Sequence, residues 1–319
     1  MHSSSTSTNL VFRGCNVNVQ SGSGSTAGTV NGYGNLIVGY NEAPTSPSRG
    51  GSHNLIVGPK HNFSSYGGLA AGYESTVSGT YATVSGGNLN TASGDYASVS
   101  AGTTNLDSGD YSSVSGGDTN TARQVATSVS GGQSNIAGTT TANVGDYANV
   151  SGGKSNEANE DYASVSGGKS NTASGDYASV SAGRLNTASG DWSSVSGGGG
   201  DPAEYGGNVA SHALSSVSDG QDNEANAYAS SVTGGVHNTA DDPGHYNTVS
   251  GGENNLADRD YSSISGGSDN TAQGVGSNIS GGKNNLIGTS GDRASVSGGS
   301  TRSVNGQYDW RGGSYFSTN

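Results

Sequence analysis

The sequence has few of the residues from which a globular core is built. Only 29% of its 319 residues are hydrophobic, and 57 are glycine. A chain of this length would normally predict two globular domains, but so little aliphatic side chain cannot fill them. The composition therefore excludes ordinary globules and predicts a thin core.

Cysteine and basic residues are also scarce. The single cysteine, Cys15, excludes an intrachain disulfide framework and any metal site that needs several thiolates, and we expect it to be a small buried residue. Lysine and arginine number 12 against 25 aspartates and glutamates, so the net charge is −13. Such a surface repels nucleic-acid phosphates and anionic lipid head groups, and we expect neither as a partner.

Long apolar runs are absent as well. No run reaches the length needed to cross a membrane, and residues 1–13 lack the basic and apolar regions of a signal peptide. We therefore expect no direct membrane insertion by this chain. The expected location is extracellular or at the cell surface, either as a piece of a longer exported protein or by another export route.

What the chain does have is a repeat of 14–15 residues. Each repeat contains an apolar residue, here called the anchor, that usually precedes Ser-Gly-Gly. Shorter and more hydrophobic versions begin at Leu36 and Leu55, and Leu69 fits the register of the later anchors. The later anchors are Val84, Val99, Val114, Val129, Val150, Val165, Val180, Val195, Val217, Val232, Val249, Ile264, Ile279 and Val296. The repeat predicts about seventeen coils of a solenoid over residues 35–304.

Two positions in each coil predict its first turn. Three places after the anchor every coil has glycine, as in Gly87, Gly102 and Gly117, which predicts a corner with positive φ or no room for Cβ. Six places after it most coils have asparagine, with Asp201 and Arg302 as exceptions. Stacked asparagines bond to one another along a solenoid, so we expect a structural ladder, with a ligand-binding array as the alternative. The ladder includes Asn90, Asn105, Asn120, Asn135, Asn156, Asn171 and Asn186.

Between these positions, small apolar and polar residues alternate. An alanine such as Ala92 recurs eight places after the anchor. A period of two is typical of strands, so each coil should contain two short strands and two turns, and the fold should be all-β. One valine and one or two alanines per coil bury little area. We therefore expect a single chain to be too thin to fold alone, and predict an intertwined homotrimer whose chains cover each other's apolar stripes.

The segments 35–39 and 54–58, both Asn-Leu-Ile-Val-Gly, are followed by coils of the form Ser-Val-Ser-Gly-Gly-x-x-Asn-x-Ala-x-Gly. This pattern resembles the head repeats of trimeric autotransporter adhesins and covers residues 35–304. The resemblance implies a left-handed parallel β-roll, a homotrimer, and binding to a glycan or to a host-surface or matrix protein. This chain differs in its usual inward pair, which is valine with glycine or alanine rather than valine with isoleucine.

An aromatic residue recurs three places before the anchor. Stacked coils would place these rings in a ladder whose faces or edges could hold a sugar chain. The alternative is that the rings cover the groove between neighbouring chains. The row consists of Tyr81, Tyr96, Tyr111, Tyr147, Tyr162, Tyr177, Trp192, Tyr246 and Tyr261.

An aspartate precedes most of these aromatic residues. Like charges at strand spacing repel one another unless they are screened or bridged. Lys154, Lys169, Arg184 and Lys283 could screen them. Calcium, the one cofactor that we consider, could bridge them through carboxylate and asparagine oxygens, although the calcium-binding nonapeptide repeat is absent. The candidate metal ligands are Asp95, Asp110, Asp161, Asp176 and Asp191, and Asp146 and Asp260 belong to the same row.

Longer intervals between anchors predict loops at 40–53, 138–146, 199–213, 240–246 and 287–293, each more typical of a connector than of a site. Residues 1–34 are expected to form a capping or joining segment, and residues 305–319 an aromatic cap.

The function expected from these patterns is not catalytic. The histidines are scattered along the chain, and no serine or cysteine lies in a nucleophile motif. We expect an adhesin head or structural surface fibre that makes multivalent contacts. A receptor-binding segment of a phage tail fibre or contractile injection system is the alternative. An ice-binding face of outward serine and threonine is a minor alternative, because regular Thr-x-Thr rows are missing.

Overall fold

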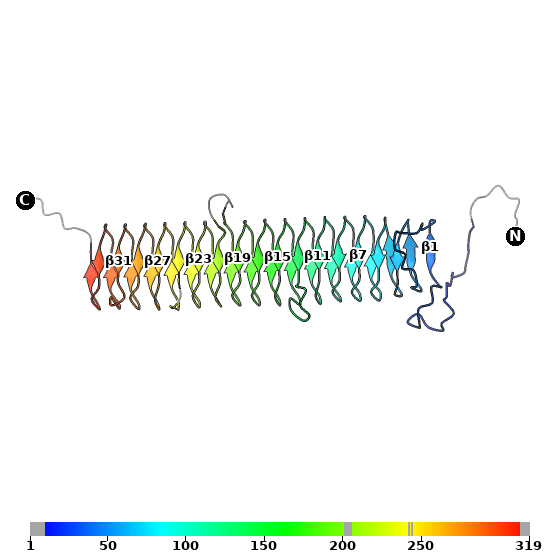
Figure 1. Ribbon diagram of the computed structural model, residues 1–319, viewed down its shortest axis with the longest axis horizontal. Helices are drawn as coiled ribbons and strands as arrows, with labels where there is room; N and C mark the ends of the chain where they lie inside the picture. The colour runs from blue at the N-terminus through cyan, green and yellow to red at the C-terminus, as the bar shows by residue number, and fades with distance from the viewer. Residues whose placement is uncertain (1–9, 201–205, 242, 244, 313–319) are drawn as a thin grey trace, which may run out of the picture.

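The computed structural model describes residues 10–200, 206–241, 243 and 245–312. In this part the chain is a parallel β-solenoid of about 18 coils without any helix, seen as a straight rod in Figure 1. Most coils contribute a strand to each of two sheets, and each strand pairs in parallel with a strand of the neighbouring coil. The predicted all-β repeat solenoid is confirmed.

The two sheets form the flat sides of the rod. The 18-stranded sheet, here called the anchor sheet, consists of β1 (Leu36–Val38), β2 (Leu55–Val57), β4 (Leu69–Ala71), β6 (Thr83–Val84), β8 (Ser98–Val99), β10 (Ser113–Val114), β12 (Ser128–Val129), β14 (Asn149–Val150), β16 (Ser164–Val165), β18 (Ser179–Val180), β20 (Ser194–Val195), β22 (Ser216–Val217), β24 (Ser231–Val232), β26 (Thr248–Val249), β28 (Ser263–Ile264), β30 (Asn278–Ile279), β32 (Ser295–Val296) and β34 (Trp310–Arg311). The 16-stranded sheet, here called the alanine sheet, consists of β3 (Asn62–Phe63), β5 (Thr76–Val77), β7 (Thr91–Ala92), β9 (Leu106–Asp107), β11 (Thr121–Ala122), β13 (Ile136–Ala137), β15 (Glu157–Ala158), β17 (Thr172–Ala173), β19 (Thr187–Ala188), β21 (Val209–Ala210), β23 (Glu224–Ala225), β25 (Thr239–Ala240), β27 (Leu256–Ala257), β29 (Thr271–Ala272), β31 (Leu286–Ile287) and β33 (Ser303–Val304).

The core is a double row of side chains inside one chain. The anchors and the alanines eight places later face inward from the two sheets, and both Val114 and Ala122 are fully buried. The expectation that neighbouring chains must cover the apolar stripe is therefore wrong, because the opposite sheet of the same chain covers it. The homotrimer stays a prediction, without this argument in its favour.

The first three coils follow a different register from the predicted one. Ile56 pairs with Ala70, and Ala70 pairs with Val84. The second and third coils therefore turn Ile56 and Ala70 inward, not the leucines one place earlier, while Ile37 of the first coil is in register with Ile56 but is exposed. Ile56 is fully buried while Leu55 is 38% exposed, as a shift of one residue in a strand requires.

Glycine forms the corner after the anchor strand for two reasons. Gly87, Gly102 and Gly117 have φ of 88°, 93° and 90°. A Cβ on any of them would also lie well under 3.0 Å from the carbonyl oxygen of the matching glycine in the next coil. Close stacking of the coils and the positive φ thus both require glycine here.

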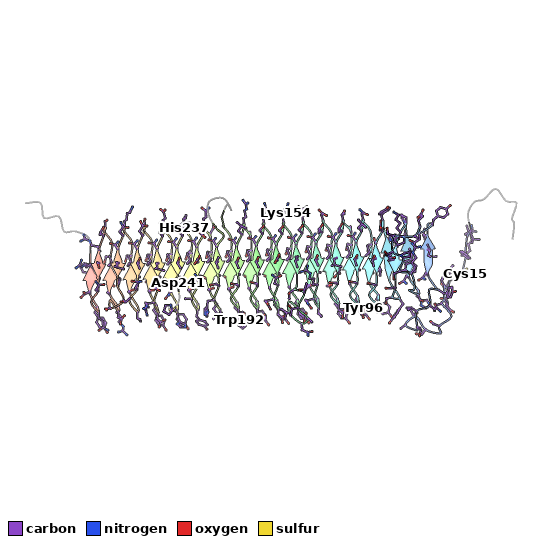
Figure 2. The ribbon with its side chains drawn as sticks, in the orientation of Figure 1. Cys15, Tyr96, Lys154, Trp192, His237 and Asp241 are labelled. Atoms are coloured by element: carbon purple, nitrogen blue, oxygen red, sulfur yellow. The ribbon has the colours of Figure 1, made fainter. Side chains whose placement is uncertain are left out.

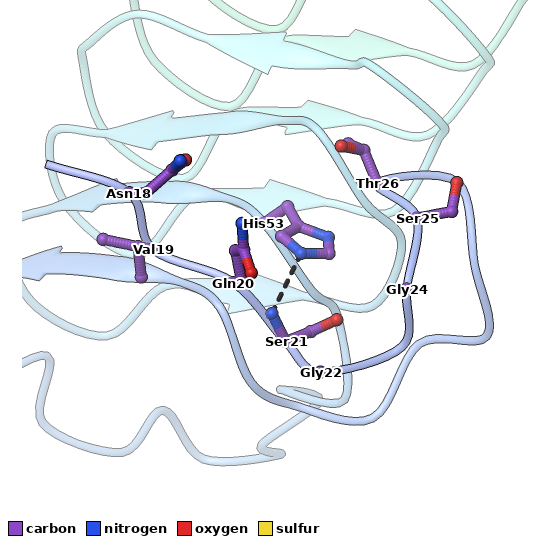
Figure 3. A pocket seen from close by; sticks show the side chains of 9 residues that line it. All are labelled: Asn18, Val19, Gln20, Ser21, Gly22, Gly24, Ser25, Thr26 and His53. Atoms are coloured by element: carbon purple, nitrogen blue, oxygen red, sulfur yellow. Dashed lines mark hydrogen bonds between the residues drawn. The ribbon is translucent and has the colours of Figure 1, made fainter. Parts of the chain in front are cut away.

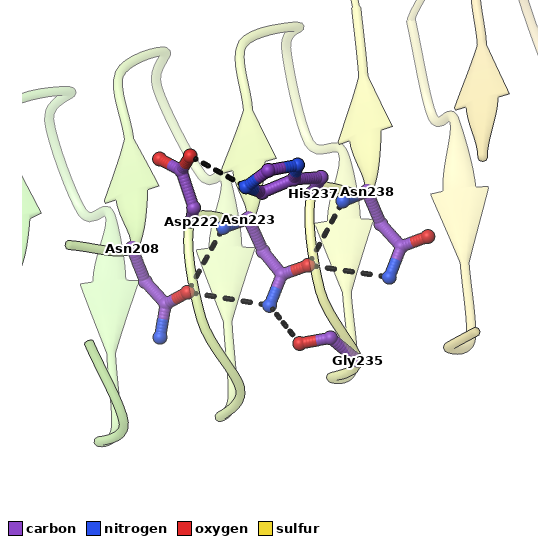
Figure 4. A network of polar contacts seen from close by, with 6 residues as sticks. All are labelled: Asn208, Asp222, Asn223, Gly235, His237 and Asn238. Carbon is purple, nitrogen blue, oxygen red and sulfur yellow. Dashed lines mark hydrogen bonds and ion pairs between the residues drawn. The ribbon is translucent and has the colours of Figure 1, made fainter. Parts of the chain in front are cut away.

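The asparagines form a buried ladder along the first turn. The Asn120 amide donates to Asn105 Oδ1 at 2.9 Å, and Asn120 Nδ2 donates to the Gly116 and Gly132 carbonyls. Figure 4 shows the same pattern for Asn208, Asn223 and Asn238. Asn120 therefore joins its turn to the coils on both sides, through its backbone amide to the preceding coil and through its side chain to the next one.

The ladder shows where one insertion lies. Asn208 donates its amide to Asn186 and accepts from Asn223, so it occupies the position that the predicted register gave to Asp201. Asp201 itself lies outside the described residues. The extra residues of this interval therefore enter within the first turn, before Asn208. At the end of the ladder, the Arg302 amide donates to Asn285 Oδ1 at 3.0 Å.

The two ends differ from the repeat. Residues 10–34 contain no strand, and Cys15 is exposed rather than buried, since this segment lies outside the double row of core side chains. At the other end β34 pairs with β32 and adds a coil to the seventeen predicted. Tyr315 and Phe316, which we placed in an aromatic cap, lie outside the described residues.

Candidate functional site

The second turn of each coil directs one side chain along an edge of the rod. Tyr96 and Tyr162 lie there with φ of 61° and 58°, a left-handed conformation that is uncommon for residues other than glycine. The Tyr162 amide donates to the Asp146 carbonyl of the preceding coil at 2.9 Å, which holds the turn in place. Figure 2 shows Tyr96 and Trp192 on the same edge.

Among the described residues, aromatic rings stacked face to face on this edge fall into three groups. One contains Tyr81, Tyr96 and Tyr111, the second runs from Tyr147 to Trp192, and the third pairs Tyr246 with Tyr261. In the second stack the ring centroids are 4.8–5.4 Å apart and the planes differ by only 2–4°. Ala126, Leu214 and Ala229 take the same turn position where the stacks are interrupted.

Stacking limits what the rings can offer to a ligand. Because each ring faces the next coil, much of its face is covered, and its edge and hydroxyl meet the solvent. Tyr162 and Tyr177 are 47% and 48% exposed. Desolvation and then the neighbouring tyrosines raise the pKa of Tyr162, so its hydroxyl stays neutral at physiological pH. The stacks thus present hydroxyls and ring edges in a straight row.

The aspartates of this edge bond to the backbone of the preceding coil. Asp95 Oδ1 accepts from the Thr80 amide at 2.7 Å, and Asp110 Oδ1 accepts from the Asp95 amide at 2.8 Å. Asp161 Oδ1 accepts from both Gly145 and Asp146 at 2.9 Å. The row therefore helps to join the coils, which spacing alone did not indicate.

The structure shows neither of the two expected ways of neutralising the aspartate row, calcium bridging and screening by basic residues. In the described part of the chain no three His, Cys, Asp or Glu side chains come together as a possible metal site. Lys154 lies on the edge opposite Tyr96 and Trp192 (Figure 2), and it forms a ladder there with Lys169 and Arg184. The expected screening of the aspartates by these basic residues is therefore wrong, because position four after the anchor belongs to the first turn.

Towards the C-terminus the chain places its own basic side chains on this edge. His245 Nδ1 lies 3.1 Å from Asp260 Oδ1, and this hydrogen bond lowers the pKa of Asp260. The Arg293 guanidinium lies 5.6 Å from the centroid of the Tyr308 ring and donates to its hydroxyl at 3.0 Å. Both basic residues occupy the second turn, one coil before their partners.

Asp107 is the polar residue that sequence reasoning missed. It takes the inward position that alanine fills in most coils, and it is fully buried. Its carboxylate accepts from the Ser98 amide at 2.7 Å and from the Ser112 hydroxyl. Burial raises the pKa of Asp107 to about 7. The sequence signal that could have revealed it is an aspartate eight places after Val99, where most coils have alanine.

A hollow of about 310 Å³ lies where the N-terminal segment passes His53 (Figure 3). His53 Nε2 accepts the Ser21 amide at 3.1 Å, so this nitrogen is not available as a base for a hydroxyl group. The lining contains no carboxylate to orient the ring. The hollow is lined by Asn18, Val19, Gln20, Ser21, Gly22, Gly24, Ser25, Thr26 and His53.

No protein-family model matches this chain, and the comparison with curated proteins finds no match. The part of the chain that the structure describes contains no helix long and apolar enough to cross a membrane. The described part of the chain is a parallel β-solenoid of about 18 coils.

Proposed function

We propose that this protein is a non-enzymatic, extracellular rod, an adhesin head or structural surface fibre that makes multivalent contacts with cell-surface or matrix molecules. The observation that carries the proposal is the recurrence of aromatic side chains in successive coils, in separate stacks along one straight edge. A partner that is itself extended meets many equivalent weak contacts on such an edge.

Multivalency makes rod length the quantity to test. Once one contact forms, the others become intramolecular, and avidity can exceed the affinity of a single contact by about 10²–10⁴. Residues 250–279 comprise two whole coils, because Ile279 matches Val249 in register. Their removal should weaken binding to immobilised matrix proteins and glycans at least several-fold, measured by surface plasmon resonance.

The matched control is removal of residues 139–144, which shortens a loop and leaves every coil in place. It should leave binding unchanged, and circular dichroism should show the same β-content in both variants. Equal binding by the full-length rod and the rod without residues 250–279 would contradict multivalent contact.

We also propose that the rod assembles as a homotrimer through its first coils. Leu36, Val38, Leu55 and Val57 lie on the outer face of the anchor sheet and are 37–53% exposed, whereas most later coils place serine there. A cluster of exposed apolar side chains at one end suits contact between copies of the chain.

Light scattering should therefore give three times the monomer mass for the wild type. Replacing Leu36, Val38, Leu55 and Val57 with serine should give the monomer mass. As a control, Leu106→Ser on the outer face of the alanine sheet should leave the trimer intact. A monomeric wild type would refute this assembly.

A further inference from the structure

Four consecutive coils carry an aspartate and an aromatic residue side by side on the second-turn edge. We call this set the central strip. Its rings lie 4.8–5.4 Å apart, so the strip is about 15 Å long. The central strip consists of Asp146, Tyr147, Asp161, Tyr162, Asp176, Tyr177, Asp191 and Trp192, with Glu160 beside it.

The negative charges of the central strip have no basic partner in the described part of the chain. Both bonds that Asp161 receives end on Oδ1, so Oδ2 remains without a protein donor there. Burial, and then the charges of Asp176, Asp161 and Asp191, raise the pKa of Glu160. The carboxylates therefore repel one another, and a cation placed among them would relieve that repulsion.

The C-terminal coils show how this edge receives a basic side chain. There Arg293 stacks on Tyr308 while it bonds the hydroxyl, and His245 pairs with Asp260. Both arrangements use the turn that carries the central strip. The central strip has the same two kinds of acceptor, tyrosine rings with their hydroxyls and carboxylates. It has no basic side chain in the place of Arg293 or His245.

We propose that the central strip binds an extended peptide segment rich in arginine and lysine. Guanidinium and ammonium groups would bond the free carboxylate oxygens and tyrosine hydroxyls, and their alkyl stems would lie along the ring edges. A strip of about 15 Å matches roughly four to five residues of extended peptide. This inference rests on the proposed multivalent function and names the chemistry of the partner.

Fluorescence anisotropy with a labelled octa-arginine peptide tests the proposal on the full-length protein. The wild type should bind saturably, and more weakly as salt rises. The double variant Asp161→Asn, Asp176→Asn should bind about tenfold more weakly. Asparagine keeps the Oδ1 acceptor, so the bonds between the coils should survive, which circular dichroism can verify.

The matched control is Asp118→Asn with Glu253→Gln, which removes the same charge from the opposite edge. It should change octa-arginine affinity less than about twofold, because distant exposed charges are screened. An equal loss in both double variants would show general attraction to an acidic protein and would overturn the proposal. So would the absence of saturable binding by the wild type.

The rod without residues 250–279 separates this inference from the proposed function. It retains the whole central strip, so its octa-arginine affinity should match that of the wild type. If it binds octa-arginine normally but loses no avidity for matrix molecules, the multivalent function fails and the central strip stands. If avidity falls with length but the central-strip variant binds octa-arginine as the wild type does, only the peptide proposal fails.

Discussion

Replacing Gly117 with alanine is expected to destabilise the rod by more than about 3 kcal/mol, or to prevent the central coils from forming. The new Cβ would lie well under 3.0 Å from the Gly132 carbonyl oxygen and close to Asn120 Nδ2. Both atoms belong to the bonds between coils, so the coils would have to separate. The φ of 90° adds strain for any residue with a side chain.

Urea unfolding followed by circular dichroism measures this effect, and Gly116→Ala is its control. A Cβ on Gly116 would meet its nearest atom at 3.9 Å, and two other coils already have alanine at this place, Ala101 and Ala182. This neighbouring substitution should leave the unfolding midpoint almost unchanged. Similar midpoints for the two variants would show that coil stacking does not require glycine at position 117.

Replacing Asp107 with alanine is expected to stabilise the rod at neutral and alkaline pH. The folded pKa of about 7 lies above the ordinary value of 3.8, so the folded state favours the protonated acid. The free energy of unfolding of the wild type should be highest below pH 4 and should fall as the pH rises to about 7. The difference between the folded and unfolded pKa values of Asp107 corresponds to a loss of roughly 4 kcal/mol in the free energy of unfolding above pH 7.

Alanine removes this loss without leaving the neighbouring groups unpaired. The Ser112 hydroxyl also bonds the Gly109 carbonyl, and the Ser98 amide also bonds the Ser112 carbonyl at 3.2 Å. Thermal unfolding between pH 4 and pH 8 should show a falling midpoint for the wild type and a flatter profile for Asp107→Ala. Asp107→Asn should flatten the profile too, because it cannot ionise. Parallel profiles for all three proteins would count against ionisation of Asp107.

The regular part of the fold was predictable because spacing alone defines it. An anchor every fifteen residues fixes which side chains face inward, and Val84, Val99 and Val114 pair as that spacing predicts. Leu36 and Leu55 were misplaced because Leu-Ile-Val does not alternate, so the pattern does not reveal which residue is inward. Asn208 was missed because a long interval does not tell which turn contains the extra residues.

The thickness of the rod was misjudged for a physical reason. Counting apolar area per coil ignores that the facing valines and alanines bury one another completely, and it ignores the asparagine ladder. Asn120 alone bonds two carbonyls and two neighbouring asparagines. The sequence predicted the candidate site as a row of aromatic residues beside a row of aspartates. It could not show that the aspartates accept hydrogen bonds from backbone amides of the preceding coil.

The bonds that join the coils point along the rod, as in the Ser113 amide to the Thr127 carbonyl at 3.0 Å. A pull along the rod therefore loads all coil boundaries in series, so that one boundary can open without a whole sheet being sheared. The rod should unfold from an end in small equal steps of one coil. Each step releases fifteen residues, which span about 50 Å when extended. A tether built this way would lengthen under tension, while the coils that remain stacked stay folded.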